Sequence, residues 1–179
     1  SRINKDYNYK FLNSLSDKDY TEELFKRIKK ELQIIMTWMG DIKPLYDAIV
    51  KQNSEYALIA YSSRVRLAHI TQFFPILENK IRTFGELCGI VPIQERIDMY
   101  HRLKEPDTVL SKIISNIIEM GGQLSDAADF FFIHFCMYGE NGLNIRNACV
   151  HGLDYCQGGE LVLALKITLT SLYMIGRRI

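Results

Sequence analysis

The sequence predicts an all-α fold, and three features of the chain indicate it. Apolar residues recur at helical spacing along most of the 179 residues, whereas the turn residues that join strands into hairpins are scarce. Glycine and proline interrupt the apolar segments at intervals typical of helix ends. Hydrophobic residues make up 47% of the chain, enough to fill one core, so we expect about one domain.

The N-terminal half is predicted to contain three helical segments. Acidic and hydroxyl residues can cap the first, which runs to about residue 39 and ends at Gly40. A second, shorter helix covers about Lys43–Gln52. A long segment over residues 55–88 follows, and Pro75 should bend or divide it because proline lacks the amide hydrogen that an inner turn requires.

The middle of the chain is predicted to hold three helices. A short one covers about residues 94–103, before the break at Glu105-Pro106-Asp107. The next covers residues 108–120 and ends at a glycine pair. Ser125 can then cap an aromatic helix that extends to residue 138.

Two apolar stretches in the C-terminal third predict buried helices. Four phenylalanines and an isoleucine over residues 130–135 leave almost no polar face, so the same chain or a second subunit must cover them. Residues 161–175, introduced by a glycine pair, are rich in β-prone types, but fifteen uninterrupted residues favour a helix. Neither stretch reaches the roughly 20 residues that cross a bilayer, so no membrane segment is expected.

The densest polar chemistry lies in residues 142–152, which read Gly-Leu-Asn-Ile-Arg-Asn-Ala-Cys-Val-His-Gly. On a helix, Asn147 and His151 stand one above the other, while Arg146 points about 140° away from His151. A guanidinium can fork onto two phosphate oxygens, an amide can hold a third group, and an imidazole can move a proton near neutral pH. The segment therefore predicts a phosphate-handling site.

Spacing alone does not select this segment. Arg64 to His69 and Arg96 to His101 have the same Arg-x-x-x-x-His spacing. Only the copy at 146–151 has Asn after the arginine, Gly after the histidine and a Gly-Leu-Asn lead before it. We therefore interpret the other copies as accidental, with His69 packed beside a solvated basic edge.

The segment resembles the motif of the HEPN superfamily, in which an arginine, a polar residue and a following histidine form a metal-independent ribonuclease site in many members. A second block, residues 74–82, contains Pro75, Glu78 and Arg82 and is similar to the Pro-x-x-Glu-x-x-x-Arg helix of an uncharacterised bacterial branch. The resemblance covers about residues 54–175. It implies an up-and-down helical bundle with additional N-terminal helices: a helical extension at 1–53 and a HEPN-like domain at 54–179.

The resemblance implies a homodimeric endoribonuclease that needs no metal and no cofactor. The wide angle between Arg146 and His151 agrees with this, because two facing motif helices would bring the arginine of one chain to the histidine of the other. His151 would act as general base on the ribose 2′-hydroxyl or as acid to the leaving 5′-oxygen. Arg146 would stabilise the extra negative charge of the transition state, and Asn147 would orient the phosphate or the histidine.

Three further residues are candidates for support of this site or for RNA contact. Glu78 and Arg82 are four residues apart, hence on one helix face, and Asn144 ends the Gly-Leu-Asn lead. The alternative for Glu78 and Arg82 is a surface ion pair. The expected context is a toxin or phage-defence system, with an antitoxin or an N-terminal regulatory region as partner.

Two other classes of function stay open. One is a non-catalytic HEPN-like module that uses the motif for dimerisation and for RNA or nucleotide binding. The other is a buried polar network in a helical scaffold. Zinc ligands can be assembled from His134, Cys136, Cys149, His151 and Cys156, but their spacing is not that of common zinc sites, so no metal is expected.

Charge and cysteine content bear on how the chain could contact RNA and on where in the cell it is expected. The formal net charge is +1, so any RNA contact depends on a local patch. The densest basic run, at residues 26–30, alternates with apolar residues and favours a solvated helix face. Four cysteines without a Cys-x-x-Cys pair, and no secretory leader, favour a cytoplasmic protein. The start at Ser1 without methionine favours a fragment of a larger protein.

Overall fold

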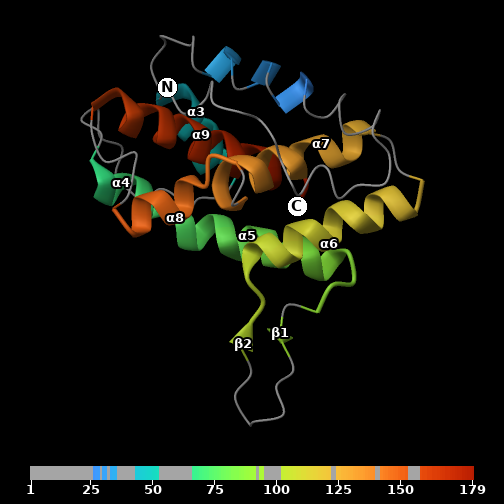
Figure 1. The fold of residues 1–179 in the computed structure, drawn as a ribbon. Helices are drawn as coiled ribbons and strands as arrows, with labels where there is room; N and C mark the ends of the chain where they lie inside the picture. The colour runs from blue at the N-terminus through green and yellow to red at the C-terminus, as the bar shows by residue number, and fades with distance from the viewer. Residues whose placement is uncertain are drawn as a thin grey trace.

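The computed structural model describes residues 26–28, 30–31, 33–35, 43–52, 66–91, 93–94, 102–121, 124–139, 142–152 and 158–179. This part of the chain is a bundle of helices with one pair of short strands (Figure 1), so the predicted all-α class is confirmed for it. The elements are α3 (Lys43–Gln52), α4 (Leu67–Thr71), α5 (Phe73–Leu87), β1 (Ile93–Gln94), β2 (Arg102–Leu103), α6 (Pro106–Glu119), α7 (Leu124–Ile133), the π-helix η3 (His134–Tyr138), α8 (Ile145–Val150) and α9 (Gly158–Gly176).

The terminal helix α9 is central, because it packs against α3, α4, α5 and α7. The prediction of a helix over residues 161–175 is confirmed. Its buried Thr168 and Ser171 donate their hydroxyl hydrogens to the carbonyls four residues earlier, at 2.8 and 2.9 Å. Such bonds let β-prone and polar residues lie inside a helix without an unpaired hydroxyl.

The long segment that was expected to divide at Pro75 divides three residues earlier. Helix α4 ends before Gln72, and α5 then begins at Phe73. Pro75 thus lies in the first turn of α5, where its missing amide hydrogen costs nothing because first-turn amides have no partner within the helix. The predicted stop at Gly89 is confirmed, since this residue has a φ of 76°.

The helix predicted over residues 94–103 is wrong at both of its described ends, and residues 95–101 lie outside the described part of the chain. Ile93 pairs with Leu103 and Gln94 with Arg102 in antiparallel strands that project from the helices (Figure 1). Pairing across the intervening segment is a long-range contact, which helical periodicity along the chain does not register.

Two helix starts differ from the predicted ones. Helix α6 begins at Pro106, two residues early, because proline is well suited to the first helical position. Ser125 lies within α7 and is not its cap, since the helix begins one residue earlier, at Leu124.

The aromatic helix is covered by its own chain. Its four phenylalanines and Ile133 are 0–1% exposed, and α7 packs against α6 and α9. The suggestion that these rings lie in a dimer contact is therefore wrong. The last turn of this helix is the π-helix η3, in which the Gly139 amide donates to the His134 carbonyl at 2.7 Å.

Part of the predicted N-terminal extension lies in the same core. Ile49 of α3 is fully buried where α3 packs on α9. In the preceding helical stretch, Ile28 and Ile35 are buried while Lys26 and Lys30 are exposed, as a solvated basic face requires. The boundary at residue 53 stays a prediction. None of the described helices combines the length and the apolar character needed to span a bilayer.

Candidate functional site

The Gly-Leu-Asn lead fastens the motif helix α8 to the π-helix. A Cβ atom on Gly142 would stand 2.0 Å from the Phe135 carbonyl oxygen, so only glycine fits there. The amide of Leu143 donates to that same oxygen at 3.0 Å, and the leucine side chain is buried. Asn144 then takes a left-handed conformation, with φ 48°, and α8 starts at Ile145. The Gly-Leu-Asn lead is thus a structural anchor that fixes the start of α8 and, with it, the position of Arg146.

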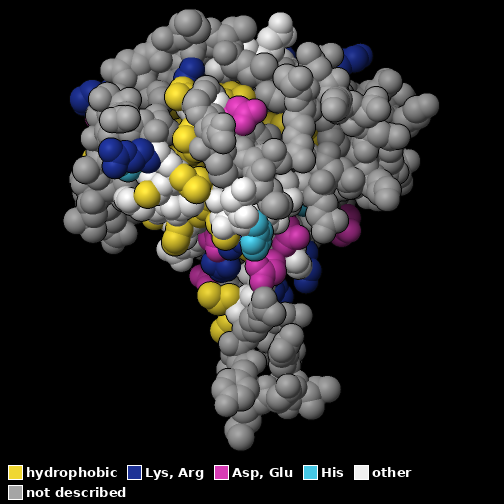
Figure 2. Space-filling model, turned by 60° about the vertical axis from the view of Figure 1, so that its left-hand side comes forward, with side chains coloured by type: hydrophobic (Ala, Val, Ile, Leu, Met, Phe, Trp, Pro, Cys, Tyr) yellow, Lys and Arg dark blue, Asp and Glu magenta, His cyan; other side chains and the backbone are white. Residues whose placement is uncertain are grey.

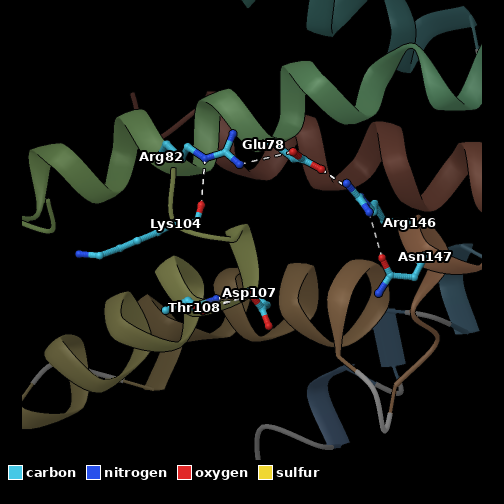
Figure 3. A network of polar contacts seen from close by, with 7 residues as sticks. All are labelled: Glu78, Arg82, Lys104, Asp107, Thr108, Arg146 and Asn147. Carbon is cyan, nitrogen blue, oxygen red and sulfur yellow. Dashed lines mark hydrogen bonds and ion pairs between the residues drawn. The ribbon is translucent and has the colours of Figure 1, made fainter. Parts of the chain in front are cut away.

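Arg146 meets Glu78 of α5, a residue 68 positions earlier. Its Nε donates to the Glu78 carboxylate Oε1 at 3.0 Å, and its Nη1 donates to the Asn147 amide Oδ1 at 3.1 Å (Figure 3). The fold therefore brings together two of the predicted motif residues and one of the predicted supporting residues. We call Glu78, Arg82, Arg146 and Asn147 the motif cluster.

Arg82 joins the motif cluster from the other side of Glu78. Its Nη2 lies 3.5 Å from Glu78 Oε2, and its Nε donates to the Lys104 carbonyl at 3.2 Å. The side chains of Glu78 and Arg82 are only 15% and 17% exposed, so the pair is largely buried against α8 and the end of the strand pair. It is not a solvated pair on one helix.

The Arg146 guanidinium has N–H donors that no described residue uses. A guanidinium has five N–H groups, and within the described part of the chain two of them are used, by Glu78 and by Asn147. The side chain is 30% exposed, so the remaining N–H groups can reach a ligand from solvent. A guanidinium oriented by two partners, with free donors on its open side, can hold an anion without losing further rotamer freedom.

His151 lies at the open end of the motif helix. It is exposed, and its backbone amide donates to the Asn147 carbonyl at 2.9 Å. Its imidazole makes no hydrogen bond to any other residue that the structure describes, Arg146 included. Within one chain, therefore, no hydrogen bond links the two ends of the predicted catalytic trio.

Two buried polar residues lie on the π-helix; the sequence pointed to one of them, His134, only as a possible zinc ligand, and assigned no role to the other, Tyr138. His134 and Tyr138 are each 7% exposed. Burial lowers the pKa of His134, and the Asp107 carboxylate opposes that shift. Burial, followed by the charge of Glu78, raises the pKa of Tyr138 well above its ordinary value. The available signal was a histidine and a tyrosine four residues apart in an otherwise apolar run.

Asn144 also has a buried polar atom. Its Oδ1 finds no hydrogen-bond donor among the described residues. Two such atoms, this oxygen and the Tyr138 hydroxyl, lie on the segments that flank the anchor of α8. Buried polar groups of this kind are uncommon and mark places where a ligand or a water completes the structure.

The competing motif copies have other fates. The Nδ1 of His69 accepts a hydrogen bond from the Arg66 amide at 3.1 Å, which caps α4. Arg64 and the copy at residues 96–101 lie outside the described residues.

The residues considered for zinc do not form a site in the described part of the chain. No group of three His, Cys, Asp or Glu side chains there is arranged to hold a metal ion. Cys136 and Cys149 are buried, and burial raises the pKa of the Cys136 thiol. Cys156 lies outside the described residues.

The surface around the strand pair carries mixed charge. Figure 2 shows basic, acidic and histidine side chains gathered where the strands leave the helices. Asp107, at the start of α6, lies across from the motif cluster (Figure 3). A ligand that approaches the described side chains here therefore meets charges of both signs.

Comparison with known proteins adds no relative. No protein-family model matches this chain, and neither a curated protein nor a solved structure matches it. The HEPN resemblance stays a prediction that depends on the two sequence blocks.

Proposed function

We propose that this chain is a metal-independent endoribonuclease of the HEPN type, built on a HEPN-like bundle and active as a homodimer. One observation carries the proposal: Arg146 is oriented by Glu78 and Asn147, is 30% exposed, and has further N–H donors that no described residue uses. That arrangement suits a phosphate whose negative charge increases during reaction. The carboxylate beside it is bound to two guanidinium groups, which disfavours a cation at that position.

The reaction follows from the chemistry of the motif residues. His151 takes the proton of a ribose 2′-hydroxyl, and the 2′-oxygen attacks the adjacent phosphorus. Arg146 stabilises the phosphorane-like transition state. The bond from phosphorus to the 5′-oxygen breaks, and the partner subunit's His151 gives that oxygen a proton. The products are a 2′,3′-cyclic phosphate and a 5′-hydroxyl.

The angle of about 140° that helical geometry puts between Arg146 and His151 supports a shared cleft. Within one chain the imidazole is exposed and makes no hydrogen bond to the guanidinium. A second motif helix related by a two-fold axis would supply the missing neighbour. The aromatic helix is buried, so the contact would have to form through α8 and its surroundings.

A second candidate is a non-catalytic module that binds RNA or nucleotides. It is favoured by the imidazole of His151, which has no orienting partner among the described residues, whereas catalytic bases are commonly held by a third group. In either case an antitoxin or an N-terminal regulatory region would control access in a toxin or defence system.

Cleavage of single-stranded RNA in the presence of EDTA tests the proposal. We expect cyclic phosphate ends, and a loss of about 100-fold or more in rate for His151→Ala and for Arg146→Ala. His69→Ala and His101→Ala, from the other motif copies, are the matched controls and should keep activity. Equal cleavage by the wild type and His151→Ala would identify a contaminating nuclease and remove the enzymatic proposal. Anion binding without cleavage would favour the binding module.

A further inference from the structure

Tyr138 carries a buried hydroxyl that has no hydrogen-bond partner among the described residues. The side chain is 7% exposed, its oxygen is out of contact with solvent, and no described residue accepts its hydrogen. Buried tyrosine hydroxyls usually find a partner, because leaving one unsatisfied costs free energy. Burying this hydroxyl without a partner therefore costs stability.

The charges around this hydroxyl come from three elements. Glu78 on α5 acts on it most strongly, followed by Arg146 on α8, Arg82 on α5 and Asp107 on α6. The strongest neighbour is thus the carboxylate that orients Arg146. Because burial and Glu78 keep the pKa of Tyr138 high, the hydroxyl is a donor throughout the physiological pH range.

The π-helix explains how the tyrosine reaches this place. A π turn is wider than an α turn and recurs at functional sites. Here it occupies His134–Tyr138, and its end is fixed by the Gly142 anchor on Phe135. The tyrosine that ends η3 thereby lies on an element that packs against α8 and α6.

We propose that Tyr138 is a positioning residue of the anion site: when a phosphate draws the Arg146 guanidinium outward, the Tyr138 hydroxyl donates to the Glu78 carboxylate in its place. The inference rests on anion binding at Arg146, as in the proposed function, but not on catalysis. The step exchanges hydrogen bonds and moves no proton between residues.

The geometry of Glu78 favours this exchange. Its Oε1 depends on Arg146 at 3.0 Å, whereas its other oxygen has only the long 3.5 Å contact to Arg82. If Arg146 turns toward a phosphate, a largely buried carboxylate oxygen loses its best donor, which would oppose binding. A hydroxyl that is idle in the free state removes that penalty. Binding then satisfies a group that the free chain leaves unpaired.

Tyr138→Phe separates this role from a structural one. It removes only the hydroxyl, so we expect the melting temperature of the free protein to stay unchanged or to rise. Binding of inorganic phosphate and of a 2′-O-methyl RNA oligonucleotide should weaken roughly ten-fold, as for one hydrogen bond to a charged group. Tyr173→Phe, on the exposed side of α9, is the matched control and should change neither quantity.

A spectroscopic readout follows the hydroxyl itself. In protein labelled with ¹³C at the tyrosine ring carbon that bears oxygen, the Tyr138 signal, assigned by its absence in Tyr138→Phe, should shift when either probe is added. The shift should be lost in Glu78→Gln. A stationary signal, or equal affinity of Tyr138→Phe and wild type, overturns the inference and leaves the ribonuclease proposal standing. If the signal shifts and Tyr138→Phe loses affinity, but the wild type cleaves no RNA, the inference stands and the ribonuclease proposal is overturned. Absence of binding to wild type would overturn both.

Discussion

Two carboxylates in this protein are each bound by two arginines, yet the two clusters are built differently. At the end of α9, Arg177 and Arg178 both bind Asp129 of α7 through one oxygen, Oδ2, and Asp129 is 5% exposed. Arg178 donates with Nε at 3.2 Å and Nη2 at 2.9 Å, and its guanidinium lies 5.2 Å from the centre of the Phe130 ring. We call Asp129, Arg177 and Arg178 the C-terminal clamp.

The motif cluster has the same charges in a looser arrangement. Arg146 and Arg82 bind different oxygens of Glu78, the second at 3.5 Å, and they come from separate helices. Two unsatisfied atoms, on Tyr138 and Asn144, lie on the adjoining segments. The clamp directs three N–H donors onto one carboxylate oxygen, whereas the motif cluster spreads its donors over both oxygens of Glu78 and adjoins two buried polar atoms that have no partner among the described residues. Such unsatisfied atoms beside an ion pair, more than residue composition, separate a candidate site from a structural ion pair.

The largest expected effect that distinguishes the clusters is on stability. Asp129→Asn leaves two arginines without their buried anion, and we expect the free energy of unfolding to fall by about 2–3 kcal/mol, less than for a fully buried pair because Arg177 can turn to water. Glu78→Gln should cost only about 1 kcal/mol, since its contacts are longer and partly solvated. Urea unfolding at neutral pH measures both.

Asp47→Asn supplies the baseline for that measurement. Its pair with Lys43 is more than half exposed, so its loss should cost less than about 0.5 kcal/mol. If Glu78→Gln proved as costly as Asp129→Asn, the motif cluster would be a second clamp and its claim as a ligand site would weaken.

The sequence predicted one of these clusters and missed the other for a physical reason. The motif residues could be recognised from their close spacing in the sequence: Arg146, Asn147 and His151. Glu78 and Arg82 could be paired because residues four apart lie on one helix face. That Glu78 would meet Arg146 required the fold, because 68 residues separate them. Asp129 and Arg178 are 49 positions apart and belong to no local pattern.

The same distinction holds for the fold. Helix Lys43–Gln52 and the helix over residues 161–175 were predictable because propensity, period and length act locally. The strand pair was not, since β1 and β2 hold each other through contacts across the intervening segment. Nor was the π-helix, because its last turn is set by packing of Gly142 on Phe135.

The neighbourhoods of the two clusters should also differ in how their stability depends on pH. The expected change in the free energy of unfolding lies between those of the variants above and of the one below. Burial lowers the pKa of His134, against the smaller opposing influence of Asp107, so the unfolded chain binds its proton more readily than the folded chain. Stability is then complete above the unfolded pKa of about 6.5 and is lost as pH falls toward the folded value, by at most about 1.4 kcal/mol per pH unit. Unfolding in urea at pH 7.5 and 5.5 measures the slope.

His134→Gln should flatten that dependence, whereas His151→Gln, at an exposed position, should leave it in place. Hydrogen exchange at low pH should report earlier opening around η3 than around the clamp. If the wild type and His134→Gln lose stability in parallel, the acid response arises elsewhere and the motif side is no more sensitive than the clamp.

The smallest effect concerns the unsatisfied atom on Asn144, and its sign is the informative part. Removing a group from the clamp should destabilise the fold. Asn144→Gly differs in two ways: it deletes an oxygen that has no donor among the described residues, and glycine suits the left-handed backbone at φ 48°. The greater conformational entropy of glycine in the unfolded chain opposes these effects. We therefore expect the free energy of unfolding to rise by only about 0.5 kcal/mol. Asn144→Ala removes the same oxygen but puts a Cβ in left-handed backbone, and it should be about 1 kcal/mol less stable than Asn144→Gly. Thermal unfolding of both variants beside the wild type decides the point. A loss of stability in Asn144→Gly would mean that the amide already has a partner in the free protein, and the contrast between the clamp and the motif cluster would then depend on Tyr138 alone.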